Sequence, residues 1–278
     1  MGTNETYKQI TKQLRADWSQ KTEPHRLQLL REILHWNGDP DKRLKIIHIT
    51  GTNGKGSTGA MLASILMTSG YKVGHFSTPA IVNEREMIRC NEGMISKEHF
   101  LKHYHAILET LVAHGGQHDT ITGFEWWTLI ALREFASREM DFIILEAGRG
   151  GANDATNIVA QPLIVALTKI NVDDLEDKDA DILDIAAEKA AIIKKGSIVV
   201  NYPGQAIEVY NILKQKALDV GAIWSATHPE ITIVSSSPRG LVLNADQLEN
   251  LHLSLTGAFQ ANNLSTVLQI ITVLKAKG

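Results

Sequence analysis

A glycine-rich run holds the residues best suited to chemistry. It reads ITGTNGKGST at 49–58 and follows the apolar stretch KIIHI at 45–49. Glycines let the backbone turn tightly and aim N–H groups at one anion, and the N-terminus of a following helix adds partial positive charge. In such a loop Lys55 would reach the β- and γ-phosphates, and a hydroxyl side chain would face a magnesium ion. The predicted nucleotide-binding residues of the run are Thr52, Asn53, Gly54, Lys55, Gly56, Ser57 and Thr58.

This run departs from the common P-loop formula in one respect. Gly56 separates Lys55 from the hydroxyl residues, whereas the usual motif places serine or threonine directly after the lysine. The alternative interpretation is a glycine-rich turn between a strand and a helix that binds no ligand.

An acidic residue follows a second apolar run. The segment DFIILEAGRGGANDATN at 141–157 predicts a buried strand that ends at Glu146. Ligands of open α/β sheets bind at the carboxyl ends of the strands, and carboxylate oxygens suit magnesium. Glu146 is therefore a candidate metal ligand; the alternatives are a solvated charge and a partner for a helix cap.

Lys189 shares a helical face with apolar residues. In DILDIAAEKAAIIKK, residues 181–195, helical spacing places this lysine beside five apolar positions. Desolvation lowers the pKa of a lysine, and a neutral amine can capture carbon dioxide as a carbamate. The alternative is a lysine whose stem covers the core while its amine reaches water. The five apolar positions are Ile182, Ile185, Ala186, Ile192 and Ile193.

The segment TGFEWW begins another predicted helix. Thr122 and Glu125 have the spacing of a capping box, in which each side chain bonds the backbone N–H of the other residue. The neighbouring Trp126 and Trp127 are expected in the core rather than in a stacking platform.

Apolar periodicity places these residues on an alternating series of strands and helices. We predict an α/β fold that contains a P-loop, with a mostly parallel sheet, helices on both faces and a small β hairpin at 231–244. The last helix is expected to leave its apolar face available. Predicted strands are 45–49, 71–76, 141–145, 162–168, 197–201 and 221–225, and predicted helices are 25–38, 59–70, 97–114, 123–140, 181–195, 205–220 and 255–278.

Composition limits the classes of partner. Of 278 residues, 44% are hydrophobic and 21% are charged, and the formal net charge is −3. No basic block is present, so we expect neither a nucleic-acid partner nor a membrane surface. The one cysteine, Cys90, cannot form an internal disulfide, and the N-terminal residues lack an apolar signal core. These features predict a cytoplasmic protein.

Two motifs together resemble one known family. GTNGKGST after KIIHI, with the upstream HRLQLLREIL, is similar to the N-terminal signature of folylpolyglutamate and dihydrofolate synthases, members of the Mur ligase superfamily. The similarity extends to Asn263, which covers nearly the whole chain. Residues that match the family pattern EVGxGGxxDxTN are Gly148, Gly150, Gly151, Asp154, Thr156 and Asn157.

The resemblance implies roles for residues around the loop. It implies that Lys189 is carbamylated, that Asn263 approaches the nucleotide and that Lys55 is catalytic. Arg149 and Ala152 depart from the family pattern, and Asp174 stands where the family has a histidine. The implied metal ligands are Ser57, Thr78, Glu146 and Asp174, and the implied substrate-binding residues are Thr122, Phe124, Glu125, Asn153, Asp154 and Ala155.

The resemblance also implies an activity. The family uses ATP and Mg²⁺ to join L-glutamate to a folate or dihydropteroate carboxylate through an acyl phosphate. We expect an ATP-binding domain at 1–256 and an interdomain linker helix at 257–278, with the family's C-terminal domain absent or supplied by a separate chain. The alternative is a truncated or degenerate homologue that binds Mg-ATP without ligase turnover. A generic P-loop phosphotransferase leaves Glu146 and Lys189 unexplained.

Overall fold

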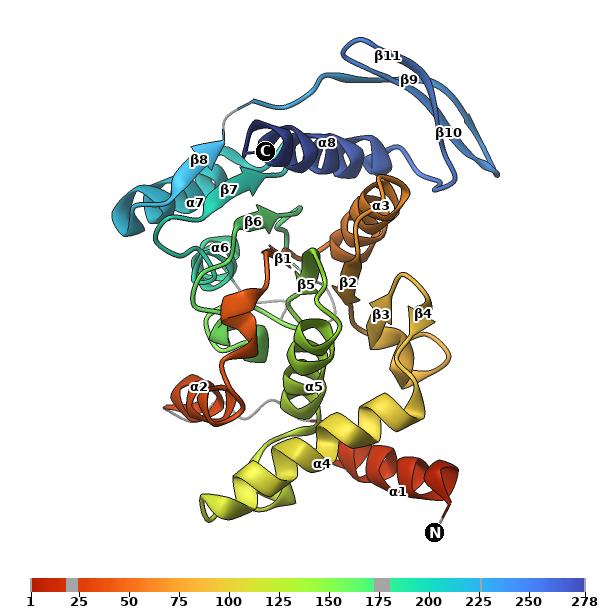
Figure 1. The fold of residues 1–278 in the computed structure, drawn as a ribbon. Helices are drawn as coiled ribbons and strands as arrows, with labels where there is room; N and C mark the ends of the chain where they lie inside the picture. Colours follow the sequence, from red (N-terminus) through yellow and green to blue (C-terminus); the bar gives the residue numbers. More distant parts are fainter. Residues whose placement is uncertain (1, 19–24, 173–180, 226, 278) are drawn as a thin grey trace. The chain divides into compact units, whose positions relative to one another are not determined.

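A computed structural model describes residues 2–18, 25–172, 181–225 and 227–277 (Figure 1). The chain forms two compact units, each with its own set of strands. The first unit contains Met1–Ile46, Leu66–Arg149 and Asn153–Ala160. The second contains Ile47–Ile65, Gly150–Ala152 and Gln161–Gly278.

Four strands of the first unit lie in the order β4-β3-β2-β5. β2 (Val73–Phe76) and β5 (Phe142–Glu146) pair in parallel and are buried along their whole length. Burial on both faces explains why their sequences lack an alternating pattern. The short strands β3 (Ile88–Cys90) and β4 (Gly93–Met94) add antiparallel pairs that the sequence did not predict.

The helices of the first unit build most of its core. α5 (Gly123–Ser137) contacts α1 (Thr3–Ala16) and α4 (Lys97–Ala113), and α2 (Arg26–Trp36) also packs against α4. Trp126 and Trp127 are buried in this core, which confirms their predicted place. Short 3-10 turns are η1 (Pro40–Arg43), η2 (Glu84–Met87), η3 (His118–Thr120) and η4 (Ala155–Ile158).

Four strands of the second unit form a parallel set in the order β1-β6-β7-β8. They are β1 (Ile46–Thr50), β6 (Ile164–Leu167), β7 (Ile198–Asn201) and β8 (Ile223–Ser225). α6 (Ile182–Ala190) and α7 (Ile207–Val220) pack together and share an apolar core with β6 and β7. α3 (Lys55–Thr68) begins in this unit and ends in the first.

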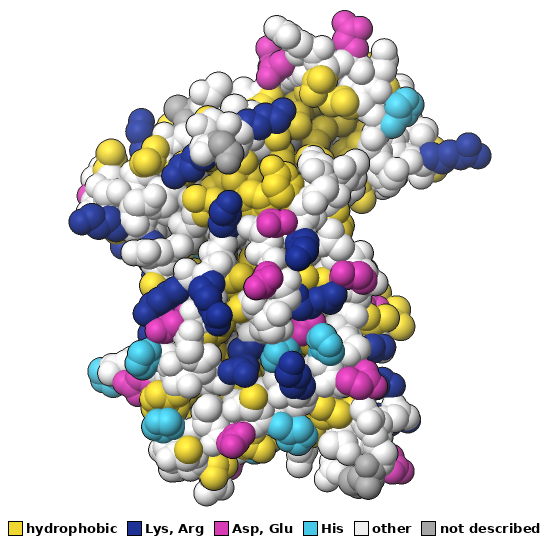
Figure 2. Space-filling model, viewed as in Figure 1, with side chains coloured by type: hydrophobic (Ala, Val, Ile, Leu, Met, Phe, Trp, Pro, Cys, Tyr) yellow, Lys and Arg dark blue, Asp and Glu magenta, His cyan; other side chains and the backbone are white. Residues whose placement is uncertain are grey.

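A separate three-stranded sheet lies near the end of the chain. β9 (Ile231–Ser237) and β10 (Gly240–Ala245) form the predicted hairpin, and β11 (Leu248–Leu253) adds a third strand that was not predicted. Hydrophobic side chains gather beside this sheet on the visible face (Figure 2). The described helices include none that is long and apolar enough to span a bilayer.

The final helix is better packed than the sequence suggested. α8 (Phe259–Lys277) contacts β6, β7 and β9, and its residues Leu264, Val267 and Ile270 are buried. The expectation that its apolar face would stay available was wrong, because the other strands of the second unit cover it. The assignment of 257–278 as an interdomain linker stays a prediction.

Most predicted elements are confirmed, so the fold is α/β with a mostly parallel arrangement of strands. α6 is the main difference, because it ends at Ala190 rather than at residue 195. Ile192 and Ile193 therefore follow the helix instead of continuing its apolar face, and they are buried in the turn that leads to β7.

Candidate nucleotide-binding site

The glycine-rich loop connects β1 to α3. At two of its glycines the neighbouring residues leave no room for a side chain. Gly51 has φ of 151°, and a Cβ there would overlap the Thr168 side chain at the end of β6. Gly54 has φ of 88°, and a Cβ there would stand 2.5 Å from Oδ1 of Asn263 in α8. The loop is thus held between β6 and α8, both in the second unit.

Backbone hydrogen bonds fix the first half of the loop. The N–H groups of Thr52 and Asn53 donate to the Lys169 carbonyl over 2.8 and 3.1 Å, and Thr52 Oγ1 donates to the Asn171 carbonyl over 2.8 Å. These two amides are therefore engaged within the protein. Nucleotide binding by Thr52 and Asn53 stays a prediction. The Asn53 side chain faces the cavity described below.

The first turn of α3 supplies backbone donors for an anion. The first α-helical bond of this turn runs from the Thr58 N–H to the Gly54 carbonyl over 2.9 Å. The N–H groups of Lys55, Gly56 and Ser57 precede it, and a helix offers such groups no acceptor of its own. Their donors and the helix dipole favour an anion at residues 54–57.

The three polar side chains of this turn are placed differently. Nζ of Lys55 donates to the carbonyls of Gly51 and Thr52 over 2.7 and 3.3 Å, so its ammonium group curls over the loop. Thr58 is fully buried, and within the described chain its Oγ1 has no hydrogen-bond partner. Ser57 Oγ instead accepts from Gln260 Nε2 over 3.2 Å.

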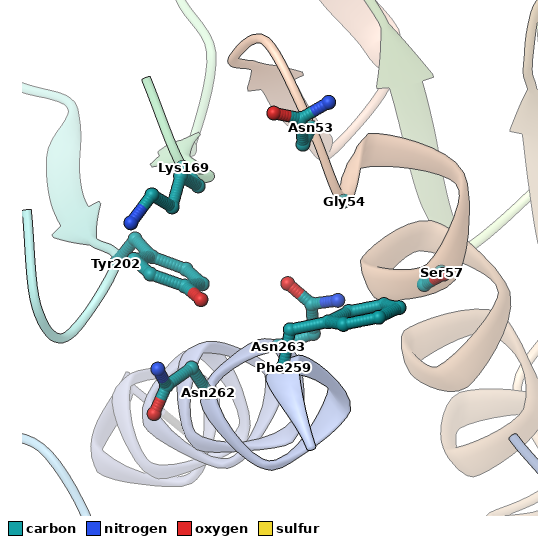
Figure 3. A pocket seen from close by; sticks show the side chains of 8 residues that line it. All are labelled: Asn53, Gly54, Ser57, Lys169, Tyr202, Phe259, Asn262 and Asn263. Carbon is teal, nitrogen blue, oxygen red and sulfur yellow. The ribbon is translucent and has the colours of Figure 1, made fainter. Parts of the chain in front are cut away.

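A cavity of about 620 Å³ opens beside the loop (Figure 3). Gln260 connects its two sides, because it also accepts a hydrogen bond of 2.9 Å from Asn263 Nδ2. Phe259 is 61% exposed there, and Nζ of Lys169 lies 5.9 Å from the centre of the Tyr202 ring. The lining residues are Asn53, Gly54, Ser57, Lys169, Tyr202, Phe259, Asn262 and Asn263.

The sequence predicted only part of this lining. Asn53, Gly54, Ser57 and Asn263 were predicted, while the remaining residues come from β-strand ends and the start of α8. Those positions carry no local motif. The parallel order β1-β6-β7 brings the segments after β6 and β7 beside the loop. This strand order was the feature that could have predicted the remaining lining residues.

Lys189 lies in the last turn of α6 and is 7% exposed, so it lies on the buried face of the helix, as its spacing predicted. The Gly150–Gly151 segment packs against this turn, since a Cβ on Gly151 would stand 2.8 Å from the Lys189 Cα. A Cβ on Gly150 would overlap the Glu188 carboxylate. The Gly150 carbonyl also accepts a hydrogen bond of 2.8 Å from Thr50 Oγ1 at the end of β1. Lys189 is therefore held near the loop-bearing strand.

Glu146 ends β5 in the first unit, as predicted, and is 1% exposed. Its Oε1 lies 2.6 Å from Nε2 of His75 in the adjacent strand β2. Its Oε2 is buried and has no hydrogen-bond partner among the described residues. A buried carboxylate oxygen without a partner fits a hard divalent cation. His75 was not predicted, because only the pairing of β2 with β5 brings it to Glu146.

The other predicted metal ligands come from different parts of the chain. Thr78 follows β2 in the first unit and is half-buried, whereas Ser57 belongs to the second unit. Asp174 lies outside the described residues.

The predicted substrate-binding residues at the start of α5 have a clear structural function. Thr122 and Glu125 form the predicted capping box. The Glu125 carboxylate also accepts hydrogen bonds from Nε and Nη2 of Arg26, the first over 2.6 Å. It accepts a third hydrogen bond, of 2.6 Å, from the Thr122 N–H. Phe124 is buried against Phe76, with ring centres 5.9 Å apart. The Arg26 partner was not predicted.

The second predicted group, Asn153 to Ala155, lies at the start of η4. Asp154 caps this turn: its Oδ1 accepts from the N–H and Oγ1 of Thr156, and its Oδ2 accepts from the Arg149 N–H. Burial raises the pKa of Asp154 above its usual value, and these hydrogen bonds act in the opposite direction. Ala155 is buried and Asn153 is exposed. Asn153 is thus the member of this group that faces solvent.

The parallel strands and the glycine loop at a helix N-terminus define a P-loop-containing α/β protein. Residues 49–271 match the sequence model of the Mur ligase middle domain. The chain belongs to that family.

Known relatives are longer than this chain. It is 34% identical to mitochondrial folylpolyglutamate synthase of Bos taurus over 99% of this chain and 46% of that protein. It is 32% identical to dihydrofolate synthase/folylpolyglutamate synthase of Bacillus subtilis (strain 168), over 84% of this chain and 56% of that protein. The chain thus spans about half the length of these curated relatives.

A solved FPGS-AMPPCP-folate complex has the same fold. It superposes with a TM-score of 0.83 at 27% identity, over 98% of this chain and 67% of that one.

Proposed function

We propose that the chain binds Mg-ATP and acts in an amide ligase that joins L-glutamate to the carboxylate of a folate or dihydropteroate. The observation that carries the proposal is the cavity between the glycine loop and α8, whose edge includes Gly54 and Asn263. The similarity to folylpolyglutamate and dihydrofolate synthases supports the substrate class. The relative with AMPPCP and folate supports both ligands.

The nucleotide would lie with its phosphates on the first turn of α3. The amides of Lys55, Gly56 and Ser57 would donate to phosphate oxygens, and the Lys55 ammonium group would exchange the Gly51 and Thr52 carbonyls for the β- and γ-phosphates. The aromatic Phe259 and Tyr202 border the same cavity and are suited to contact the base.

Glu146 would hold magnesium, and Ser57, Thr78 and Asp174 stay predicted ligands. The unpartnered Oε2 of Glu146 supports its assignment. Magnesium would neutralise charge on the phosphates during transfer. His75 would orient the Glu146 carboxylate through Oε1.

The reaction that fits these groups has two steps. An oxygen of the acceptor carboxylate attacks the γ-phosphorus, the bond to the β-phosphate oxygen breaks, and ADP leaves an acyl phosphate. The glutamate amine then attacks the acyl carbon, phosphate departs, and the amine loses a proton. Lys55 would stabilise charge on the transferring phosphoryl group, so the protein acts mainly by positioning and electrostatics.

Lys189 is proposed to act as a carbamate. A neutral amine at this position would attack carbon dioxide, forming an N–C bond and releasing one proton. The support is its burial beside the Gly150–Gly151 segment.

The acceptor is proposed to bind near the start of α5 and η4, two elements of the first unit that contact each other. Asn153, which is exposed, would contact it directly. Thr122, Glu125, Asp154 and Ala155 would shape the site, because their polar atoms or side chains are already packed within the protein.

The test combines binding with turnover. Calorimetric titration of the purified chain with Mg-ATP should show one site, and ADP release should require a folate acceptor together with glutamate. Binding without ADP release would favour the alternative, a homologue that binds Mg-ATP without ligating. Absence of binding would overturn the proposal as a whole.

A further inference from the structure

Two histidines and a glutamate meet between α4 and α5 in the first unit, two helices that pack against each other (Figure 1). Nδ1 of His99 lies 3.0 Å from both carboxylate oxygens of Glu134, and Nε2 of His103 lies 2.8 Å from Oε2. The three ligand atoms lie within 4.8 Å of one another. None of these residues lines the nucleotide cavity.

We propose that His99, His103 and Glu134 bind a divalent transition-metal ion of the zinc class. His99 and His103 are four residues apart on α4, so a single helical turn presents both rings on one face. Two imidazoles and one carboxylate are a known zinc ligand set that leaves a fourth position for water. Imidazole nitrogen favours zinc, copper or nickel over magnesium, which prefers oxygen ligands.

The cluster has a buried side and an exposed side. His103 and Glu134 are buried, while the His99 side chain is 48% exposed. The N–H of His99 also donates to Oγ of the helix-capping residue Ser96 over 3.1 Å, which fixes the start of α4. An ion can therefore reach two preplaced ligands from solvent through movement of the His99 ring.

The charged neighbour of the cluster is a guanidinium. Arg138 Nη1 lies 3.7 Å from Glu134 Oε1 and opposes a bound cation by charge. Arg138 is also paired with Glu92 over 2.8 Å, which offsets part of that charge.

A metal ion here would clamp α4 to α5. Binding to the folded state alone stabilises a protein in proportion to RT ln(1 + [L]/Kd). The same three side chains could instead serve only as a hydrogen-bonded triad around Glu134, and that alternative predicts no affinity for zinc.

The experiment uses the full chain after removal of metals with EDTA. Zn²⁺ is titrated by calorimetry in excess Mg²⁺, and Co²⁺ is titrated by visible absorption, which reports coordination directly. We expect the wild-type chain to bind one Zn²⁺ and to show a raised Tm. His99→Ala and Glu134→Gln should bind Zn²⁺ at least about tenfold more weakly. His105→Ala is the matched control, since His105 is exposed on the same helix and lies outside the cluster.

His99→Ala is the decisive variant, because its exposed side chain can be removed with the core intact, as circular dichroism would verify. Absence of Zn²⁺ binding by the wild-type chain would overturn the proposal. Equal binding by the wild-type and His99→Ala chains would overturn it as well, since the ion would then be held elsewhere.

Discussion

The Oδ1 atom of Asn263 lies 2.5 Å from the point where a Cβ on Gly54 would stand. This contact joins the end of the glycine loop to α8, about two hundred residues later in the sequence. Because Gly54 also has φ of 88°, its conformation and its neighbour both exclude a side chain.

Gly54→Ala should therefore weaken Mg-ATP binding at least tenfold, because the new methyl group displaces Asn263 and distorts the turn that aims the amides. Calorimetric titration measures the effect. Gly70→Ala is a matched control: φ there is 89°, but a Cβ would meet nothing within 4 Å. It should lower the free energy of unfolding by about 1 kcal/mol and leave ATP affinity unchanged. If Gly54→Ala bound ATP as tightly as Gly70→Ala, the glycine loop would not be the ATP-binding site.

Glu146→Gln tests the predicted metal ligand. The amide keeps the shape of the side chain but removes its charge, so the Mg²⁺ concentration that supports half-maximal ATP binding should rise about tenfold. Nucleotide binding in the presence of EDTA should change little. An unchanged Mg²⁺ dependence would show that Glu146 does not serve the metal.

Glu125→Ala separates capping from substrate contact. Removing one partner of the buried Arg26–Glu125 pair leaves the other charge uncompensated, so the free energy of unfolding should fall by about 3 kcal/mol. Thr122→Ala removes only the cap and should cost about 1 kcal/mol. Urea denaturation measures both. A Glu125→Ala chain of wild-type stability would mean that the carboxylate is kept for a ligand instead.

His48 should make stability depend on pH. Burial, with a smaller contribution from Lys194, lowers its pKa to about 3, whereas an unfolded histidine titrates near 6.5. Between these values the unfolded state binds the extra proton, so the folded state loses up to about 1.4 kcal/mol per pH unit as the pH falls. Stability is unaffected by this group above pH ~6.5.

Urea denaturation of the wild type and His48→Leu at several pH values between these limits isolates this contribution. The variant should show a shallower loss of stability on acidification. His105→Ala, an exposed histidine, should keep the wild-type slope. Identical slopes for all three chains would contradict the assignment to His48.

Local sequence was enough to predict the features that depend on one segment. The glycine loop, the acid at the end of β5 and the place of Lys189 on the buried face of its helix follow from glycine spacing, apolar runs and helical periodicity. The capping box of α5 was visible for the same reason, because its two residues are three apart in the chain.

Features that depend on distant segments were not predictable in the same way. His75 meets Glu146 only through the pairing of β2 with β5, and Arg26 meets Glu125 across 99 positions. The third strand of the small sheet, β11, alternates only weakly and is largely exposed, so its sequence resembles a loop. α1 was overlooked because a polar composition hid its few buried residues, such as Leu14.

The most direct test of the central claim is calorimetric titration of Mg-ATP into the wild-type chain and into Lys55→Met. Methionine keeps most of the side-chain volume but lacks the ammonium group that now lies over the loop carbonyls. We predict one ATP site in the wild type and at least a tenfold weaker site in Lys55→Met, with a retained fold by circular dichroism. Equal affinities, or a wild-type chain that binds no ATP, would contradict the account.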